Sequence, residues 1–167
     1  MILIGGGSRS GKSRAALEML KWAGPRRGFI ATAQAWDDEM TERIARHRQE
    51  RGLEIVTWEE PFAVAERIQA EDGRYDAIVV DCLTLWLSNL MLAESGSVEG
   101  ECRRLVEVCA LAQTKVILVT NEVGCGIVPE NALARRFRDE AGRLNQMAAQ
   151  RALEVHWTVF GIGMRIK

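Results

Sequence analysis

The chain has 167 residues, of which 47% are hydrophobic and 27% charged, and its formal net charge at pH 7 is -1. This length and composition predict one compact domain over residues 1–167, and the near-neutral charge argues against nucleic acid as a partner. No apolar stretch approaches the roughly 20 residues that span a bilayer, and the chain starts inside an apolar run with no room for a signal peptide, so we expect a cytoplasmic protein without a membrane span.

The first apolar run, Ile2–Ile4, leads into a glycine-rich loop. This loop fits the pattern G-x-x-x-x-G-K followed by Ser or Thr, and good helix formers follow it. In that pattern backbone N–H groups turn toward phosphates, the lysine reaches the β- and γ-phosphates, and the hydroxyl can bind Mg²⁺. We interpret the loop as a nucleotide-binding P-loop, with Lys12 catalytic and Ser13 a metal ligand, over an incidental glycine-rich turn. Its residues are Gly6, Gly7, Ser8, Arg9, Ser10, Gly11, Lys12 and Ser13.

Short apolar runs then alternate with longer helical patterns. Strands are predicted at Ile2–Ile4, Gly28–Ala31, Glu54–Thr57, Ala77–Val80, Val116–Thr120 and Val155–Val159, with a last edge at Arg165–Ile166. Helices are predicted at Lys12–Trp22, Asp38–Glu50, Phe62–Ala70, Leu83–Ala93, Glu99–Leu111 and Asn131–Ala152. The run from Val116 to Val119 is continuously apolar, which is typical of a strand buried on both faces.

The alternation of strands and helices predicts the fold class. We expect an α/β fold of the P-loop NTPase type, in which helices cover a mostly parallel sheet and the ligand lies at the carboxyl ends of the strands. The segment Gly161–Met164 is typical of a hairpin turn. It predicts an antiparallel hairpin at the C-terminal edge of the sheet.

Asp81 directly follows the buried run Ala77–Val80, so it emerges where that strand ends. In P-loop enzymes an acid at such a position holds Mg²⁺ opposite the hydroxyl of the loop, which here is Ser13. The alternative is a cap for the helix that begins near Leu83. The P-loop favours the metal role.

A second candidate is His47, in the helix that opens with acidic residues at Asp37–Glu39. Met40, Ile44, His47 and Arg51 recur at helical spacing, which places the histidine on the inward stripe. An imidazole held among arginines could act as a nucleophile toward phosphorus or as an acid–base catalyst. From spacing alone, a structural histidine or an arginine-rich solvated face remains slightly favoured. The other histidine, His156, lies inside the last long strand, where packing suits it better.

The polar, glycine-bearing segment Thr120–Asn131 follows a buried strand, which is where an α/β sheet builds its site. The alternative is an ordinary turn in which Asn131 caps the next helix. Three arginines, Arg135, Arg136 and Arg138, then crowd the start of that helix. Alone they are typical of a solvated face, but beside a phosphate site they could bind anions.

Together these segments resemble the bifunctional adenosylcobinamide kinase and adenosylcobinamide-phosphate guanylyltransferase family of cobalamin biosynthesis. The resemblance covers nearly the whole chain, and the segments after the P-loop are more specific than the P-loop itself. It rests on Gly6–Ser13, Ile30–Ala33, Asp37–Met40, Arg43–Arg48, Leu118–Asn131, Arg136–Asp139 and Gly142–Gln146.

The resemblance implies two reactions. A nucleoside triphosphate, ATP or GTP, phosphorylates the hydroxyl of adenosylcobinamide, and GTP then gives GMP to the new phosphate through a GMP-histidine at the position of His47. It also implies Mg²⁺ and assembly into a homo-oligomer, a trimer. Nucleotide contacts are implied at the P-loop and at Ala31, Thr32, Ala33, Arg48, Gln49, Glu50, Arg51, Glu59 and Asp81. The alternatives are a monofunctional P-loop kinase and a nucleotide-dependent switch, although the N-K-x-D motif of switch GTPases is absent.

Overall fold

The computed structural model describes residues 1–35, 37–93 and 96–167, apart from the side chains of Arg43 and Glu50. The strands are β1 (Ile2–Gly6), β2 (Arg27–Ala31), β3 (Val56–Glu59), β4 (Ala77–Asp81), β5 (Lys115–Val119), β6 (Glu154–Val159) and β7 (Ile162–Arg165). The helices are α1 (Lys12–Ala23), α2 (Asp38–Arg51), α3 (Val64–Glu71), α4 (Leu83–Leu92), α5 (Val98–Leu111) and α6 (Ala132–Arg151). Among these, no helix is both long and apolar enough to cross a membrane.

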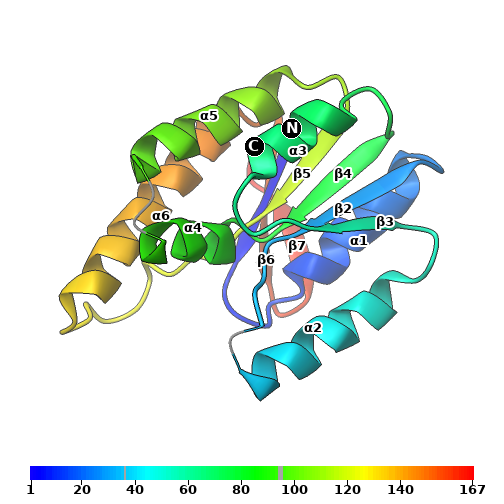
Figure 1. Ribbon diagram of the computed structural model, residues 1–167. Coiled ribbons are helices and arrows are strands. Elements are labelled where there is room, and N and C mark those ends of the chain that lie inside the picture. The colour runs from blue at the N-terminus through cyan, green and yellow to red at the C-terminus, as the bar shows by residue number, and fades with distance from the viewer. Residues whose placement is uncertain (36, 94–95) are drawn as a thin grey trace.

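The strands form one sheet in the order β3-β2-β4-β5-β1-β6-β7 (Figure 1). Every neighbouring pair is parallel except β6 and β7, which are antiparallel. The predicted α/β fold with a mostly parallel sheet and an antiparallel C-terminal edge is confirmed. Because β1 lies between β5 and β6, the loop after β1 emerges beside the ends of both strands.

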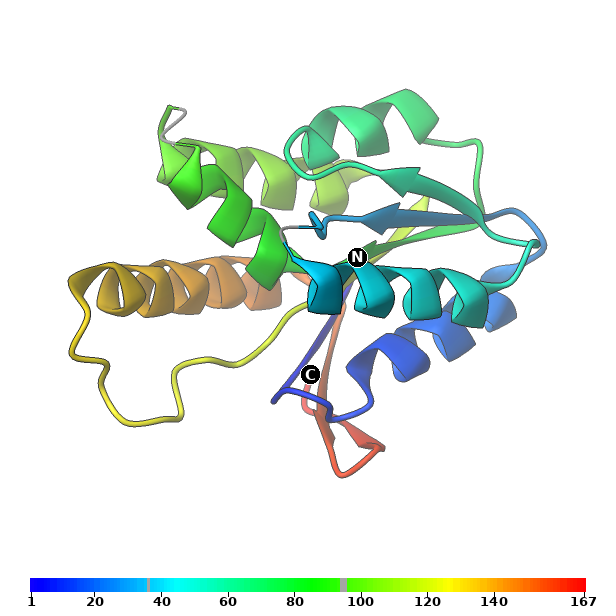
Figure 2. The ribbon, with the colours of Figure 1, turned by 60° about the horizontal axis from the view of Figure 1, so that its bottom comes forward.

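Two apolar cores cover the two faces of the sheet. Val116 and Leu118 join the core formed with α3, α4, α5 and α6, whereas Ile117 and Val119 join the core formed with α1. All four side chains are at most 1% exposed, which confirms that this strand is buried on both faces. Figure 2 shows α1 and α3 on opposite sides of the sheet.

The hairpin at the C-terminal edge turns earlier than predicted. Phe160 and Gly161 form the turn, both with positive φ (52° and 79°), and β7 begins at Ile162. The predicted turn at Gly161–Met164 and the edge strand at Arg165–Ile166 are therefore wrong in position. Gly163 does not serve a turn because it pairs with Thr158 across the ladder.

The third strand is also displaced from its predicted range. It runs from Val56 to Glu59 instead of Glu54 to Thr57, because its register on β2 pairs Gly28 with Val56 and Ala31 with Glu59.

The predicted helices begin and end within two residues of the observed ones. Side-chain caps fix several of these ends. Asp37 accepts a hydrogen bond from the Met40 N–H at 2.7 Å, and Asn131 accepts one from the Ala134 N–H at 3.0 Å.

Candidate nucleotide-binding and catalytic site

The predicted P-loop follows β1 and bends tightly at two glycines. Gly6 has φ 153°, and a Cβ there would lie 2.3 Å from the carbonyl oxygen of Thr158. Gly11 has φ 99°, and a Cβ there would lie 3.0 Å from the Cα of Gly161. Both positions combine a positive φ with close backbone, so only glycine fits without rearrangement.

Lys12 is the first residue of α1, and its side chain folds back across the loop. Its Nζ donates hydrogen bonds to the Gly7 carbonyl at 2.6 Å and to Ser10 Oγ at 3.4 Å, and the residue is only 6% exposed. The helix behind it has Gly11 at its N-cap, with no side-chain cap and no acidic residue in the first turn. The N–H groups and the positive end of the helix dipole therefore face the loop, which favours an anion there.

Asp81 ends β4 and accepts a hydrogen bond from the Ser13 hydroxyl. Burial raises the pKa of the Asp81 carboxyl, and the Ser13 hydrogen bond and the positive charges of His47, Lys12 and Arg51 oppose that rise. Asp81 does not cap α4, because Cys82 occupies the N-cap position and no side chain caps that helix. These four side chains therefore all act electrostatically on Asp81.

The Ser13 and Asp81 oxygens are donors of the kind that Mg²⁺ prefers. Within the described part of the chain, no group of three or more His, Cys, Asp or Glu residues could hold a metal ion. A pair of protein oxygens suits a cation that takes its remaining ligands from water and nucleotide phosphates. The donor set therefore fits a nucleotide-bound Mg²⁺ and not a metal held by protein alone.

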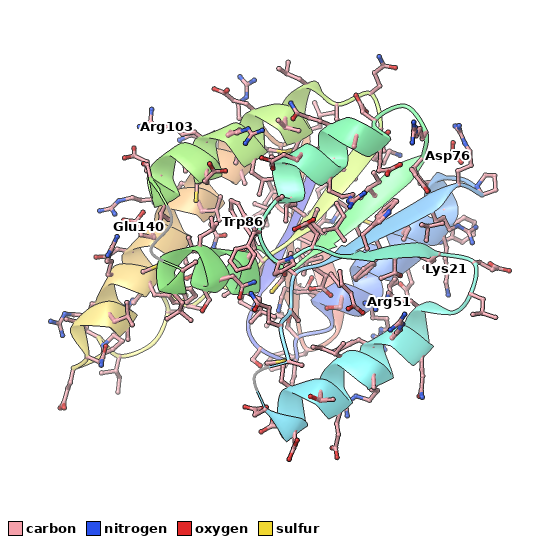
Figure 3. All side chains as sticks on the ribbon, viewed as in Figure 1. Lys21, Arg51, Asp76, Trp86, Arg103 and Glu140 are labelled. Carbon is pink, nitrogen blue, oxygen red and sulfur yellow. The ribbon has the colours of Figure 1, made fainter. Side chains whose placement is uncertain are left out.

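His47 lies on the side of α2 that faces the site. Met40, Ile44 and His47 are partly buried and Arg51 is buried, whereas the described side chains between them are exposed. The inward stripe predicted from spacing is thus observed. The guanidinium of Arg51 points toward the sheet and lies over the Phe29 ring, with Cζ 4.4 Å from the ring centroid (Figure 3). This stacking places the C-terminal end of α2 against β2.

The other residues predicted for the nucleotide differ in their surroundings. Arg48 is exposed and forms an ion pair with Glu59 at 3.4 Å, which links α2 to the end of β3. Gln49 is exposed on the outer side of α2, away from the buried stripe, and the side chain of Glu50 lies outside the described residues. The structure therefore brings Arg48 and Glu59 together, while Gln49 lies outside the buried stripe of α2.

At the end of β2, Ala31 is buried and Ala33 is partly buried. The buried hydroxyl of Thr32 donates to the Cys82 carbonyl and accepts from the Cys82 N–H, both at 2.8 Å. Asn89 also donates to the Thr32 carbonyl, at 2.8 Å. The Thr32 side chain thus ties β2 to the segment after Asp81, and this segment supports the position of that carboxylate.

The segment Thr120–Asn131 starts beside the P-loop and then leaves it. Its Glu122 N–H donates to the Gly6 carbonyl at 3.0 Å, and its Asn121 N–H donates to Thr84 Oγ1 at 2.8 Å. Figure 2 shows the rest of the loop, in yellow, extending away from the sheet to the start of α6. Only the beginning of this segment is therefore placed at the predicted site.

The arginines at the start of α6 hold this loop. Arg135 Nη1 donates to the carbonyls of Pro129 at 2.9 Å and Glu130 at 2.6 Å, and Arg138 donates to the carbonyl of Gly124. Through these bonds each of the two guanidinium groups donates to loop carbonyls. They give the two arginines a structural role that the sequence pattern did not predict.

Two residues behind the P-loop were missed by the sequence analysis. The Gly161 N–H donates to the Ser10 carbonyl at 2.9 Å, and the Thr158 carbonyl lies against Gly6. The C-terminal hairpin therefore supports the P-loop from the side of β6. The only signal in the sequence is a glycine in a turn, and the contact joins segments about 150 residues apart.

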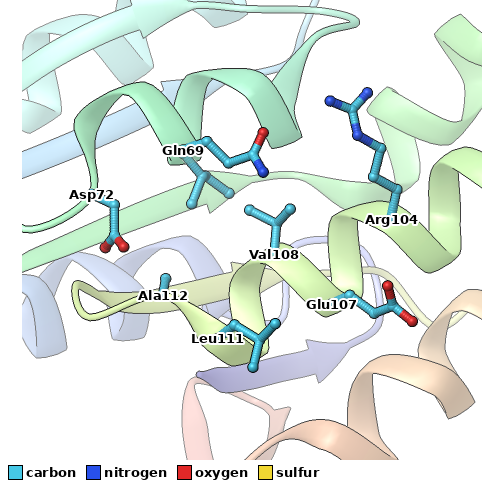
Figure 4. Close-up of a pocket in the computed structure, with 8 residues that line it drawn as sticks. Gln69, Asp72, Arg104, Glu107, Val108, Leu111 and Ala112 are labelled. Atoms are coloured by element: carbon cyan, nitrogen blue, oxygen red, sulfur yellow. The ribbon is translucent and has the colours of Figure 1, made fainter.

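The surface also carries a groove of about 390 Å³ between α3 and α5 (Figure 4). Its Asp72 accepts hydrogen bonds from the backbone N–H groups of Gln113 and Thr114 at 3.2 and 2.9 Å. This carboxylate thus serves the fold. None of the lining residues is among those predicted to bind a nucleotide.

Solved structures support the fold. The chain is similar to the RadB recombinase, with a TM-score of 0.56 and 16% identity over 93% of this chain and 72% of that one. It is also similar to a second solved structure, an ATPase domain, with a TM-score of 0.50 and 12% identity over 93% of this chain and 68% of that one. At such low identity the likeness shows the fold alone.

Curated relatives are much more similar. A bifunctional adenosylcobalamin biosynthesis protein, CobP, from Pseudomonas aeruginosa is 45% identical over 99% of this chain and 96% of its own length. The bifunctional adenosylcobalamin biosynthesis protein CobU from Salmonella typhimurium is 44% identical over 100% of this chain and 99% of its own. The family model described as cobinamide kinase / cobinamide phosphate guanyltransferase matches residues 2–166. The chain belongs to the cobinamide kinase / cobinamide phosphate guanyltransferase family.

Proposed function

We propose that this protein phosphorylates adenosylcobinamide with a nucleoside triphosphate and then transfers GMP from GTP to the adenosylcobinamide phosphate, through a GMP-histidine at His47. The observation that carries the proposal is the electrostatic coupling of the P-loop and of α2 to Asp81. The P-loop residues Lys12 and Ser13 and the histidine of α2 all lower the pKa of this carboxyl, which supports a site shared by the P-loop and α2.

In the kinase step, the γ-phosphoryl group passes to the hydroxyl of the corrinoid side chain. The Lys12 ammonium and the N–H groups of the loop stabilise the negative charge that spreads over the transferring phosphoryl oxygens. Ser13 and Asp81 are the residues that would hold Mg²⁺, which supplies further neutralisation of the phosphates when bound. The ADP or GDP then leaves with the electron pair of the broken P–O bond.

In the guanylyl step, the neutral imidazole of His47 attacks the α-phosphorus of GTP and expels pyrophosphate. An oxygen of adenosylcobinamide phosphate then attacks the same phosphorus, breaks the P–N bond and forms adenosylcobinamide-GDP. The nearby guanidinium groups of Arg48 and Arg51 offset the phosphate charge.

The remaining nucleotide contacts of the proposal come from the family resemblance. The Thr32 hydroxyl bonds to Cys82, its N–H donates to the Asp81 carbonyl and its carbonyl accepts from Asn89, so Thr32 supports the site from within the protein. The Arg48–Glu59 pair would have to open or shift to reach a nucleotide, because each now neutralises the other. The residues proposed in this group are Ala31, Thr32, Ala33, Arg48, Gln49, Glu50 and Glu59.

We also propose a cytoplasmic location and assembly into a homotrimer, both from the resemblance. Sedimentation equilibrium tests the assembly directly. The proposal requires a mass three times that of the chain, and a monomer would contradict it.

The test of the proposed function is product analysis. Protein, Mg²⁺, adenosylcobinamide and GTP are incubated with and without ATP, and corrinoid products are identified by mass spectrometry. We expect the phosphate first and adenosylcobinamide-GDP later, with both lost in Lys12→Ala and only the second lost in His47→Ala. Products that stop at the phosphate in the parent protein would identify a monofunctional kinase. Nucleotide binding without any product would identify a switch.

A further inference from the structure

The kinase step needs a group that accepts the proton of the attacking hydroxyl. A positioned carboxylate is a common choice for this role, and in α/β sheets it comes from the carboxyl ends of the strands. Four carboxylates lie at those ends in the described part of this chain: Glu59, Glu60, Asp81 and Glu122.

Three of these carboxylates either lie far from the P-loop or belong to the proposed metal pair. Glu59 pairs with Arg48, and Glu60 accepts hydrogen bonds from the N–H groups of Phe62 and Ala63 at 3.3 and 2.9 Å. Both also lie at β3, four strand spacings or roughly 19 Å from β1. Asp81 bonds to Ser13 and belongs to the proposed metal pair.

Glu122 also accepts one backbone hydrogen bond, but it lies directly beside the P-loop. It follows β5, the strand next to β1, and its own N–H donates to the Gly6 carbonyl at 3.0 Å, so its backbone touches the first residue of the P-loop. The side chain is partly buried, and its Oε1 accepts from the Gly124 N–H, which fixes the carboxylate's orientation. Among the described residues, no hydrogen bond reaches its Oε2.

We propose that Glu122 is the proton acceptor of the kinase step, an inference that rests on the proposed function. The hydroxyl oxygen of the corrinoid side chain attacks the γ-phosphorus, and its proton passes to the Glu122 carboxylate. The bond between the γ-phosphorus and the β,γ-bridging oxygen breaks, and its electron pair leaves on the nucleoside diphosphate. This assigns a role to the Thr120–Asn131 segment, whose polar start lies at the site.

The decisive variant is Glu122→Gln, because the amide oxygen can still accept from the Gly124 N–H. General-base catalysis contributes about 10² to 10⁴-fold, so we expect kcat for adenosylcobinamide phosphorylation to fall by about that factor. KM for the nucleotide should stay within about twofold. Formation of GMP-protein from GTP deprotonates no alcohol, so its rate should also stay within about twofold and reports that the site is folded. Glu130→Gln, an exposed change in the same loop, is the matched control.

Three results would overturn the inference. A kcat within about threefold of the parent would exclude Glu122 as the base. Equal losses in phosphorylation and in GMP-protein formation would assign it a structural role only. If the parent makes GMP-protein but never phosphorylates adenosylcobinamide, the kinase half of the proposed function fails and the inference fails with it.

Discussion

At Gly6 the backbone leaves no room for a side chain. A Cβ would lie 2.3 Å from the Thr158 carbonyl oxygen, and φ is 153°, whereas a Cβ at Gly7 would meet nothing within 4 Å. We expect Gly6→Ala to lower the free energy of unfolding by about 2 kcal/mol or more, through strain and overpacking. The neighbouring Gly7→Ala should change it by less than about 0.5 kcal/mol. Urea unfolding of the two variants measures both values, and equal effects would contradict the geometry.

Asp81→Asn tests what burying a carboxylate does to stability. Because burial raises the pKa of Asp81 above its ordinary value of 3.8, the folded state holds its proton to a higher pH than the unfolded state. The contribution of this raised pKa to the free energy of unfolding is fully present below pH 3.8 and is lost as the pH rises through the folded pKa. We therefore expect the variant, in EDTA without nucleotide, to be more stable than the parent at pH 7.

The difference in free energy of unfolding between Asp81→Asn and the parent should shrink as the pH falls toward 3.8. Urea unfolding at a series of pH values measures it. The same variant should lose kinase activity, since it loses a proposed metal ligand. A variant less stable than the parent at pH 7 would show that the attraction of Lys12, Arg51 and His47 outweighs the desolvation of the carboxylate.

Among the elements, α2 carries the proposed nucleophile, and its start depends on one cap. Asp37 Oδ1 accepts from the Met40 N–H at 2.7 Å. We expect Asp37→Ala to weaken the helix by about 1 kcal/mol and to slow GMP-protein formation, because His47 lies two turns into that helix. Asp37→Asn should restore both, since asparagine caps as well as aspartate. Stopped-flow labelling and helix circular dichroism check this, and a failure of the asparagine variant to rescue would exclude capping as the cause.

Local signals predicted most of the elements. The N-termini of α2 and α6 are capped by the neighbouring side chains of Asp37 and Asn131, so these helix starts can be found from sequence. Strand ends depend on partners. Val56 begins β3 because it pairs with Gly28, and the turn at Phe160–Gly161 is fixed by the pairing of Thr158 with Gly163. Neither pairing is visible in the sequence itself.

The site divides in the same way. The P-loop and the inward face of His47 follow from contiguous residues and helical spacing. The stacking of Arg51 on Phe29 and the hydrogen bond from Gly161 to Ser10 join segments far apart in the chain. Such contacts form only in the folded sheet, so no local sequence pattern predicts them.

For the whole molecule, nucleotide binding and stability are linked. A ligand that binds only the folded state at 100 times its Kd adds about 2.7 kcal/mol, which for a chain of this size raises Tm by roughly 5–10 °C. We expect that shift with Mg²⁺ and GTP in the parent and its loss in Lys12→Ala. Differential scanning calorimetry measures it. An equal shift in Lys12→Ala would place the nucleotide away from the P-loop.

The chain has two histidines, and they allow the sharpest test of the proposed chemistry. His156 bonds to Glu154 at 3.0 Å within β6, whereas His47 lies on the partly buried stripe of α2. The first measurement is therefore incubation with Mg²⁺ and GTP labelled at the α-phosphate, followed by denaturation. We predict an acid-labile, base-stable label on the parent and on His156→Gln but none on His47→Ala. No label on a folded parent that binds GTP, or a label that persists on His47→Ala, would contradict the GMP-histidine mechanism at this position.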